Sequence, residues 1–108
     1  MSMHEFILEE NKTTAATGTT RTMNTTPFVP GTQVMAYIET DLAYAGKPDI
    51  EGSDDGGTTW SIVWSPGTIV AATGPHTMQK VITLKEKMRL KWTRTAGTIV
   101  KASLVSAV

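Results

Sequence analysis

The feature that most constrains the fold of this chain is the spacing of its apolar residues. They alternate with polar ones and do not repeat convincingly at helical spacing over ten or more residues. An apolar residue at every second position places one face of a β-strand against a core. The clearest case is residues 88–93, where Met88, Leu90 and Trp92 occupy the alternate positions. Threonine is abundant as well, and β-branched residues favour strands. The pattern therefore predicts an all-β protein.

Glycine and proline divide the chain into short extended segments. Strands are predicted over residues 33–39, 48–53, 60–65, 68–72, 78–84, 88–93 and 100–104. Trp60, Ile62 and Trp64 are expected to share one face of the third of these, and Val100 is expected to begin the inner face of the last. Residues 41–47 are predicted as a short helical turn or loop. Seven or eight such strands predict a single small β-sandwich or jelly-roll-like barrel.

The first third of the chain differs in composition from the rest. Residues 12–26 (KTTAATGTTRTMNTT) contain almost no large apolar side chain and so have little surface to bury. Pro27, Pro30 and Gly31 then indicate a turn at which the compact domain begins. We therefore predict an extended threonine-rich N-terminal arm over residues 1–32 and a sandwich domain over 33–108. The stretch at residues 12–26 is either an edge strand or flexible leader, or a segment that orders against a neighbouring subunit.

Composition removes several classes of function. The chain of 108 residues suits one domain, and it has no cysteine for disulfides, zinc–thiolate sites or thiol nucleophiles. Residues 1–11 contain three glutamates around a short apolar run, which is unlike a secretion signal. No segment reaches the roughly 20 apolar residues of a membrane span. We expect a protein that is made in the cytoplasm of its host and does not bind membranes.

Charge is distributed unevenly although the net charge is zero. Residues 1–55 contain nine acidic and three basic residues, whereas residues 56–108 contain one acidic and seven basic residues. One interpretation is mutual neutralisation within a subunit, and the other is an acidic face meeting a basic face on a neighbouring copy or partner. The basic residues are not interleaved with aromatic ones in a nucleic-acid-binding motif, so no nucleic-acid partner is predicted.

One short motif can be recognised at residues 53–60 (SDDGGTTW). Ser53, Asp55, Gly57, Thr59 and Trp60 fit the pattern S-x-D-x-G-x-T-W, which resembles the Asp box of sialidases and other β proteins. The resemblance implies a β-hairpin whose acidic side chain accepts hydrogen bonds from turn amides and whose tryptophan packs beneath the turn. A single box in a short chain, with no catalytic set, predicts a folding device and no sialidase activity.

A wider resemblance covers roughly residues 33–108. The run at 50–60, the strand at 88–93 and the terminal segment at 98–104 look like small virion proteins of tailed bacteriophages. Proteins of this kind serve as capsid decoration (cement) proteins or as modules of tail structures. The resemblance implies a structural protein on the capsid surface of a virion, with the major capsid protein as its partner.

Chemical alternatives draw on few residues. Calcium would prefer an oxygen cluster such as Asp49, Glu51, Asp54 and Asp55, but the spacing is not that of an EF-hand loop. His4 and His76 stand far apart in the sequence, and no serine elbow or phosphate-binding glycine loop occurs. We therefore predict no enzyme, no metal and no cofactor.

Tryptophan decides between the two main functional hypotheses. Trp60, Trp64 and Trp92 either anchor the core or form an exposed platform on which sugars stack, with Trp64 as the candidate ligand residue. Their alternation with other apolar residues favours the core. The leading hypothesis is thus a homotrimeric capsid decoration protein. The alternatives are a carbohydrate- or receptor-binding β module of a phage tail or secreted enzyme, and a head–tail or tail-tube component.

Overall fold

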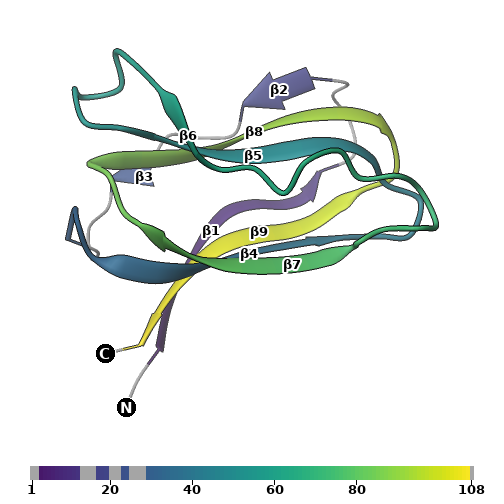
Figure 1. Cartoon of the computed structure of the whole chain (residues 1–108), viewed down its shortest axis with the longest axis horizontal. Coiled ribbons are helices and arrows are strands. Elements are labelled where there is room, and N and C mark those ends of the chain that lie inside the picture. The colour runs from purple at the N-terminus through teal and green to yellow at the C-terminus, as the bar shows by residue number, and fades with distance from the viewer. Residues whose placement is uncertain (1–2, 13–16, 20–22, 25–28, 108) are drawn as a thin grey trace.

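The all-β prediction is confirmed by the computed structural model, which describes residues 3–12, 17–19, 23–24 and 29–107. This part of the chain forms nine strands and no helix (Figure 1). The strands are β1 (Met3–Lys12), β2 (Thr17–Thr19), β3 (Met23–Asn24), β4 (Gln33–Thr40), β5 (Ala45–Ser53), β6 (Ser61–Trp64), β7 (Thr77–Thr83), β8 (Lys87–Ala96) and β9 (Ile99–Ala107). The described residues accordingly include no helix able to cross a membrane.

The strands form two antiparallel sheets that face each other as a sandwich. One sheet has the order β1-β9-β4-β7, and the other has the order β2-β8-β5-β6 with β3 also paired to β8. Figure 1 shows the two sheets as separate layers, with the start of β1 beside the end of β9. Strands that are neighbours in a sheet are mostly distant in sequence, so the core closes only when the whole chain folds.

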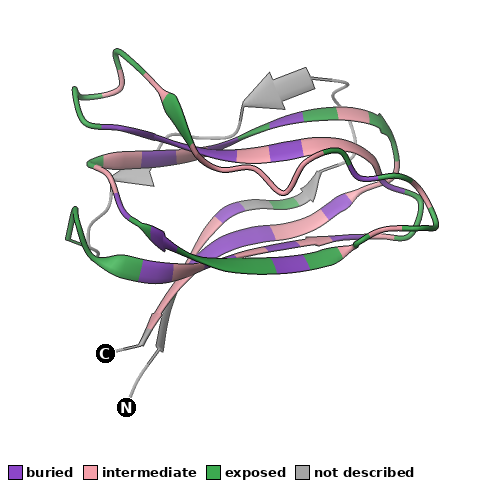
Figure 2. Cartoon of the chain, viewed as in Figure 1, coloured by how far each residue is buried: buried purple, intermediate pink, exposed green. Residues whose placement is uncertain are grey.

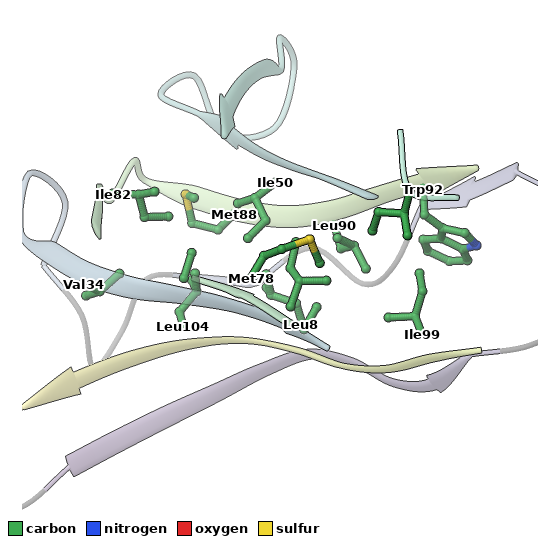
Figure 3. Packing of buried hydrophobic residues seen from close by; sticks show 14 of the residues in the cluster. Leu8, Val34, Ile50, Met78, Ile82, Met88, Leu90, Trp92, Ile99 and Leu104 are labelled. Atoms are coloured by element: carbon green, nitrogen blue, oxygen red, sulfur yellow. The ribbon is translucent and has the colours of Figure 1, made fainter. Parts of the chain in front are cut away.

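The core lies between the sheets and follows the alternation read from the sequence. Met88, Leu90 and Trp92 of β8 are all buried, and every second residue of β4 is buried as well. Figure 2 shows this as alternating bands along the strands, and Figure 3 shows the buried side chains meeting between the layers. Burial of this apolar surface is the main force that holds the two sheets together.

The N-terminal segment departs from the predicted arm. Residues 3–12 form β1, which pairs with β9 along its length, and Leu8 is completely buried in the core. The physical reason is the apolar run at residues 6–8, which supplies the inner face of a strand. The boundary predicted at residue 32 therefore does not mark the edge of the sandwich. Residues 1–2, 13–16, 20–22 and 25–28 of the predicted arm lie outside the described residues.

Two predicted inner faces are shifted by β-bulges. Ile62 of β6 pairs with Glu51, and Trp64 pairs with the adjacent residue Ile50. The strand β6 therefore has one extra residue, Val63, between these two pairs. This irregularity leaves Ile62 53% exposed, while Val63 packs against the core. A similar shift between β4 and β9 buries Ile99 in place of Val100. The alternation of apolar and polar residues within one strand predicts that strand well, but it does not reveal an extra residue in its pairing with a neighbour.

Two further predictions differ from the structure. Residues 45–47, predicted as the end of a turn or loop, are the first residues of β5 and pair with β8. The other difference is the predicted strand at residues 68–72. This segment makes only isolated bridges, Gly46 with Ile69 and Val70 with Gly74, and belongs to no named strand. Ile69 is nevertheless 1% exposed and belongs to the core, and its backbone exchanges two hydrogen bonds with Gly46 in β5. The segment is a covering loop over the end of the sandwich.

Charge neutralisation within the subunit accounts for much of the sequence asymmetry. Among the described residues, three of the four ion pairs join the acidic first half to the basic second half. They are Lys85–Asp54 at 3.1 Å, Arg89–Glu51 at 2.7 Å and Lys101–Glu5 at 2.7 Å. The two halves interleave in the sheets, and the opposite charges therefore meet within one molecule.

Candidate functional site

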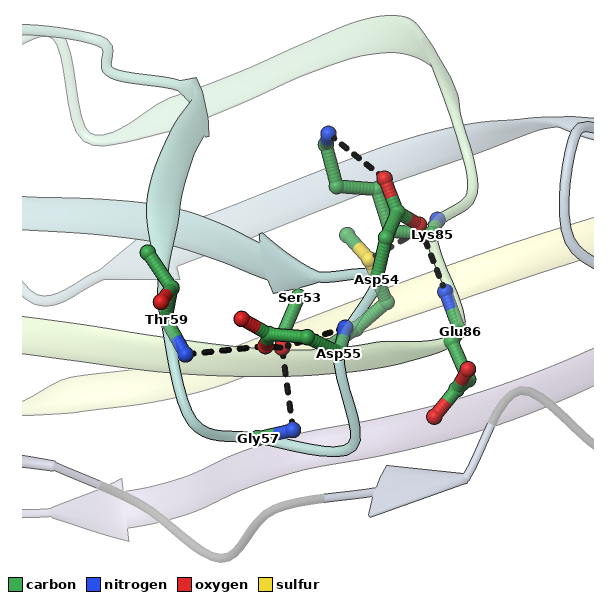
Figure 4. Close-up of polar contacts among 8 residues, drawn as sticks. Ser53, Asp54, Asp55, Gly57, Thr59, Lys85 and Glu86 are labelled. Atoms are coloured by element: carbon green, nitrogen blue, oxygen red, sulfur yellow. Dashed lines mark hydrogen bonds and ion pairs between the residues drawn. The ribbon is translucent and has the colours of Figure 1, made fainter.

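The loop of residues 53–60 joins β5 to β6 and is held by its own polar side chains (Figure 4). Asp55 Oδ1 accepts hydrogen bonds from the Ser53 hydroxyl at 2.7 Å and from the backbone N–H of Thr59 at 2.8 Å. The Ser53 Oγ in turn accepts the N–H of Gly57 at 3.0 Å. An acidic side chain that accepts turn amides is the geometry that the motif predicts.

Trp60 closes the loop from the other side. Its indole Nε1–H donates to the carbonyl oxygen of Gly57 at 2.9 Å, and Gly57 has a φ of +97°, which glycine adopts without steric cost. The guanidinium of Arg89 lies 4.1 Å from the centre of the indole ring. Arg89 also forms an ion pair with Glu51, and Glu51 is only 8% exposed. Trp60 therefore stabilises the hairpin through a cation–π contact with Arg89, which is itself held by a largely buried ion pair.

Asp54 connects this loop to the loop between β7 and β8. Its carboxylate accepts hydrogen bonds from the Lys85 ammonium at 3.1 Å and from the backbone N–H of Glu86 at 3.4 Å. The Lys85 contact, followed by the Glu86 amide, lowers the pKa of Asp54 below its ordinary value. Lys85 lies directly against Gly52, where an added Cβ would come within 2.7 Å of Lys85 Cδ. Sequence reasoning missed this link because it joins residues 31 positions apart.

Acid should weaken the loop through Asp55. Its pKa is lowered to about 2, first by the Ser53 hydroxyl and then by the Thr59 amide. Because the folded pKa lies below the unfolded one, this contribution is complete above about pH 4 and is lost as the pH falls towards 2. We expect the melting temperature of the native protein to fall more steeply between pH 4 and pH 2 than that of Asp55→Asn.

Two variants check the role of Asp55 at neutral pH. Asp55→Ala removes the acceptor of two hydrogen bonds and should lower the melting temperature, whereas Thr58→Ala on the same exposed loop should leave it nearly unchanged. Equal melting temperatures for the native protein and Asp55→Ala would show that these hydrogen bonds do not stabilise the fold.

The other candidate residues are not gathered into one site. Trp92 is 2% exposed, Trp64 packs against the core with part of its surface accessible, and Trp60 sits over Arg89. The structure therefore does not place the three tryptophans in a single exposed row. Trp64 keeps some accessible surface but lines neither of the hollows described below.

The four carboxylates considered for calcium do not form one cluster. Asp49 lies 3.6 Å from the Lys47 ammonium, and the carboxylates of Glu51, Asp54 and Asp55 have the different partners given above. Within the described ranges, no cluster of three or more histidine, aspartate or glutamate side chains could hold a metal ion. His76 Nδ1 lies 3.0 Å from the Thr40 hydroxyl, and the side chain of His4 lies outside the description.

A groove runs along the open side of the sandwich between β6 and β7. Its volume is about 580 Å³, and its walls combine apolar and charged residues: Pro30, Val63, Lys80, Val81, Asp54 and Lys85. A second, more polar hollow of about 240 Å³ shares the Asp54–Lys85 pair and reaches Asp55, Thr59 and Ser61. The groove depends on which strands become sheet edges, and the sequence pattern carries no signal for that order.

Comparison with known proteins adds no assignment. No protein-family model, no curated protein and no solved structure matches this chain. The functional proposal therefore rests on the sequence resemblance and on the geometry of the surface.

Proposed function

We propose that this chain is a non-enzymatic structural protein of a bacteriophage virion that decorates the capsid and strengthens contacts between major capsid subunits. The observation that carries the proposal is the groove on the open side of the sandwich, where the edge strand β7 borders apolar and charged side chains. An edge of this kind suits contact with another protein chain. The resemblance to small virion proteins supplies the identity of the partner.

Hydrogen bonds and ion pairs beside the groove support a binding role without chemistry. The carboxylates of Asp54 and Asp55 are engaged by neighbouring donors, and Glu51 is paired with Arg89. Such a module binds by burying surface against its partner, with its own shape fixed in advance. Many copies on a symmetric lattice, and a trimer in particular, would convert modest affinity per contact into lasting occupancy.

Sedimentation tests this proposal. The isolated protein is centrifuged alone to measure its oligomeric state, and it is then mixed with purified mature and immature capsids of a phage that encodes it. We expect a trimer that co-sediments with mature capsids and saturates at a fixed ratio to the major capsid protein. A stable monomer that remains in the supernatant with both kinds of capsid would contradict the proposal.

A carbohydrate- or receptor-binding module is the second candidate. The observation in its favour is the polar hollow beside the hairpin, which is lined by carboxylate and hydroxyl groups of Asp54, Asp55, Thr59 and Ser61. Sugar sites usually add an exposed aromatic ring, and neither Trp60 nor Trp64 lines this hollow. Retention on immobilised host-cell polysaccharide, together with no binding to capsids, would favour this candidate over the first.

A further inference from the structure

The backbone of β7 has one unpaired side. Among the described strands, β7 pairs with β4 alone. Just beyond its two ends, the Leu84 N–H donates to the Thr32 carbonyl at 2.9 Å, and the Thr40 N–H donates to the His76 carbonyl at 2.8 Å. Alternate residues of an antiparallel strand bond the same neighbour, and the β4–β7 register is unbroken. The residues between these positions at 77, 79, 81 and 83 therefore direct their N–H and C=O groups away from β4, and Val81 and Thr83 line the groove.

Lys80 stands at the centre of this edge on its inner side. The residues two positions away, Met78 and Ile82, are buried between the sheets, so Lys80 shares their face of the strand. Lys80 itself is exposed and lines the groove. Within the described part of the chain, no carboxylate lies within ion-pair distance of its ammonium. Lys85, the other lysine of the groove, is already paired with Asp54.

This lysine discriminates between possible partners. A second copy that added its own β7 across a twofold axis centred on Lys80 would bring two ammonium groups opposite each other. Inward-pointing charges on edge strands are a known protection against such self-pairing. A strand with a carboxylate at the same position would instead form an ion pair inside the groove.

We propose that the β7 edge is a docking site for an extended acidic segment of a partner protein, which adds to the sheet as a further antiparallel strand. A carboxylate of the segment pairs with Lys80, and apolar side chains cover Val63 on the inner side and Val81, which is 53% exposed, on the outer side. The identification of that partner as the major capsid protein rests on the function proposed above.

Two blocked heptapeptides test the charge preference. The peptide Ac-TVVETVT-amide is written to pair antiparallel with residues 77–83 and to place its glutamate opposite Lys80, and Ac-TVVKTVT-amide is its control. Binding is followed by NMR shifts of the backbone amides at 77, 79, 81 and 83. We expect the glutamate peptide to bind about fivefold more tightly than the lysine peptide, with the preference reversed in Lys80→Glu. Equal affinities, or no shifts in β7 with either peptide, would overturn the proposal.

A backbone variant tests the mode of binding. Val81→Pro removes an outward N–H without removing a hydrogen bond to β4, and edge strands tolerate proline at such positions. We expect it to lose peptide binding, whereas Val81→Thr, which keeps the amide, retains it. Peptide binding by folded Val81→Pro would overturn strand addition, and the Lys80→Glu comparison still tests the site if this variant does not fold.

Three further outcomes bear on this proposal, and the last two separate it from the proposed function. Amide shifts in β7 that depend on protein concentration, with no peptide added, would identify a second copy as the occupant and overturn an acidic partner. Capsid binding that is unchanged in Lys80→Glu would overturn docking at β7 and leave the capsid function standing. If the native protein did not bind capsids but kept the peptide preference, the capsid function would be overturned and docking at β7 would stand.

Discussion

Replacing Leu8 with alanine is expected to lower the free energy of unfolding by about 2–5 kcal/mol. Leu8 is completely buried although it lies in the segment that the sequence marks as an arm. Its removal leaves a cavity between β1 and the rest of the core, and the surrounding strands close such a cavity only partly. Small domains are stable by about 5–15 kcal/mol, so the loss is a large share of the total. Urea denaturation measures it.

An exposed residue provides the matched control for Leu8. Val81→Ala removes apolar atoms from a side chain that is already 53% exposed, and it should change stability by no more than about 0.5 kcal/mol. If Leu8→Ala cost as little as this control, β1 would not be part of the stabilising core.

Replacing Gly97 with alanine is expected to cost more than about 4 kcal/mol or to prevent folding. Gly97 lies in the turn between β8 and β9 with a φ of +77°. A Cβ at this position would come within 2.2 Å of the backbone nitrogen of Tyr44. Backbone atoms of a neighbouring turn have no room to yield, and Tyr44 is fixed further because its hydroxyl donates to the Thr93 carbonyl at 2.7 Å.

The loss at Gly97 has two causes, the positive φ and the close approach of Tyr44, and Gly67→Ala separates them. Gly67 has a φ of +87°, but nothing lies within 4 Å of an added Cβ. Its replacement should therefore cost only the backbone strain of a left-handed residue, about 1–2 kcal/mol. Thermal unfolding of both variants makes the comparison, and similar losses at the two positions would show that close packing against Tyr44 is not what Gly97 provides.

Local patterns predict most of the strands. Met88, Leu90 and Trp92 point inward as their alternation indicates, and the predicted strands at 33–39 and 78–84 differ from β4 and β7 by a residue at the ends. These elements were predictable because period-two alternation reflects burial of one face. The loop at 53–60 was predictable for a similar reason, since its hydrogen bonds join residues within four positions of each other.

Features that depend on distant contacts were not predictable. β1 lies beside β9, the last strand in the chain, so the residues at 6–8 find their buried surface only after the C-terminal segment is in place. The shift of Ile62 to the surface follows from the register against β5. The pairing of Asp54 with Lys85 and the groove at β7 likewise depend on strand order. Each of these is a property of the sheet as a whole.

Heating of purified capsids tests the central claim most directly. Capsids of a phage that encodes this chain are prepared without the protein, and the temperature at which they release their DNA is measured before and after the protein is added back. A protein that clamps neighbouring capsid subunits should raise this temperature in proportion to its occupancy, up to saturation. A release temperature that does not change at full occupancy would contradict a cementing role.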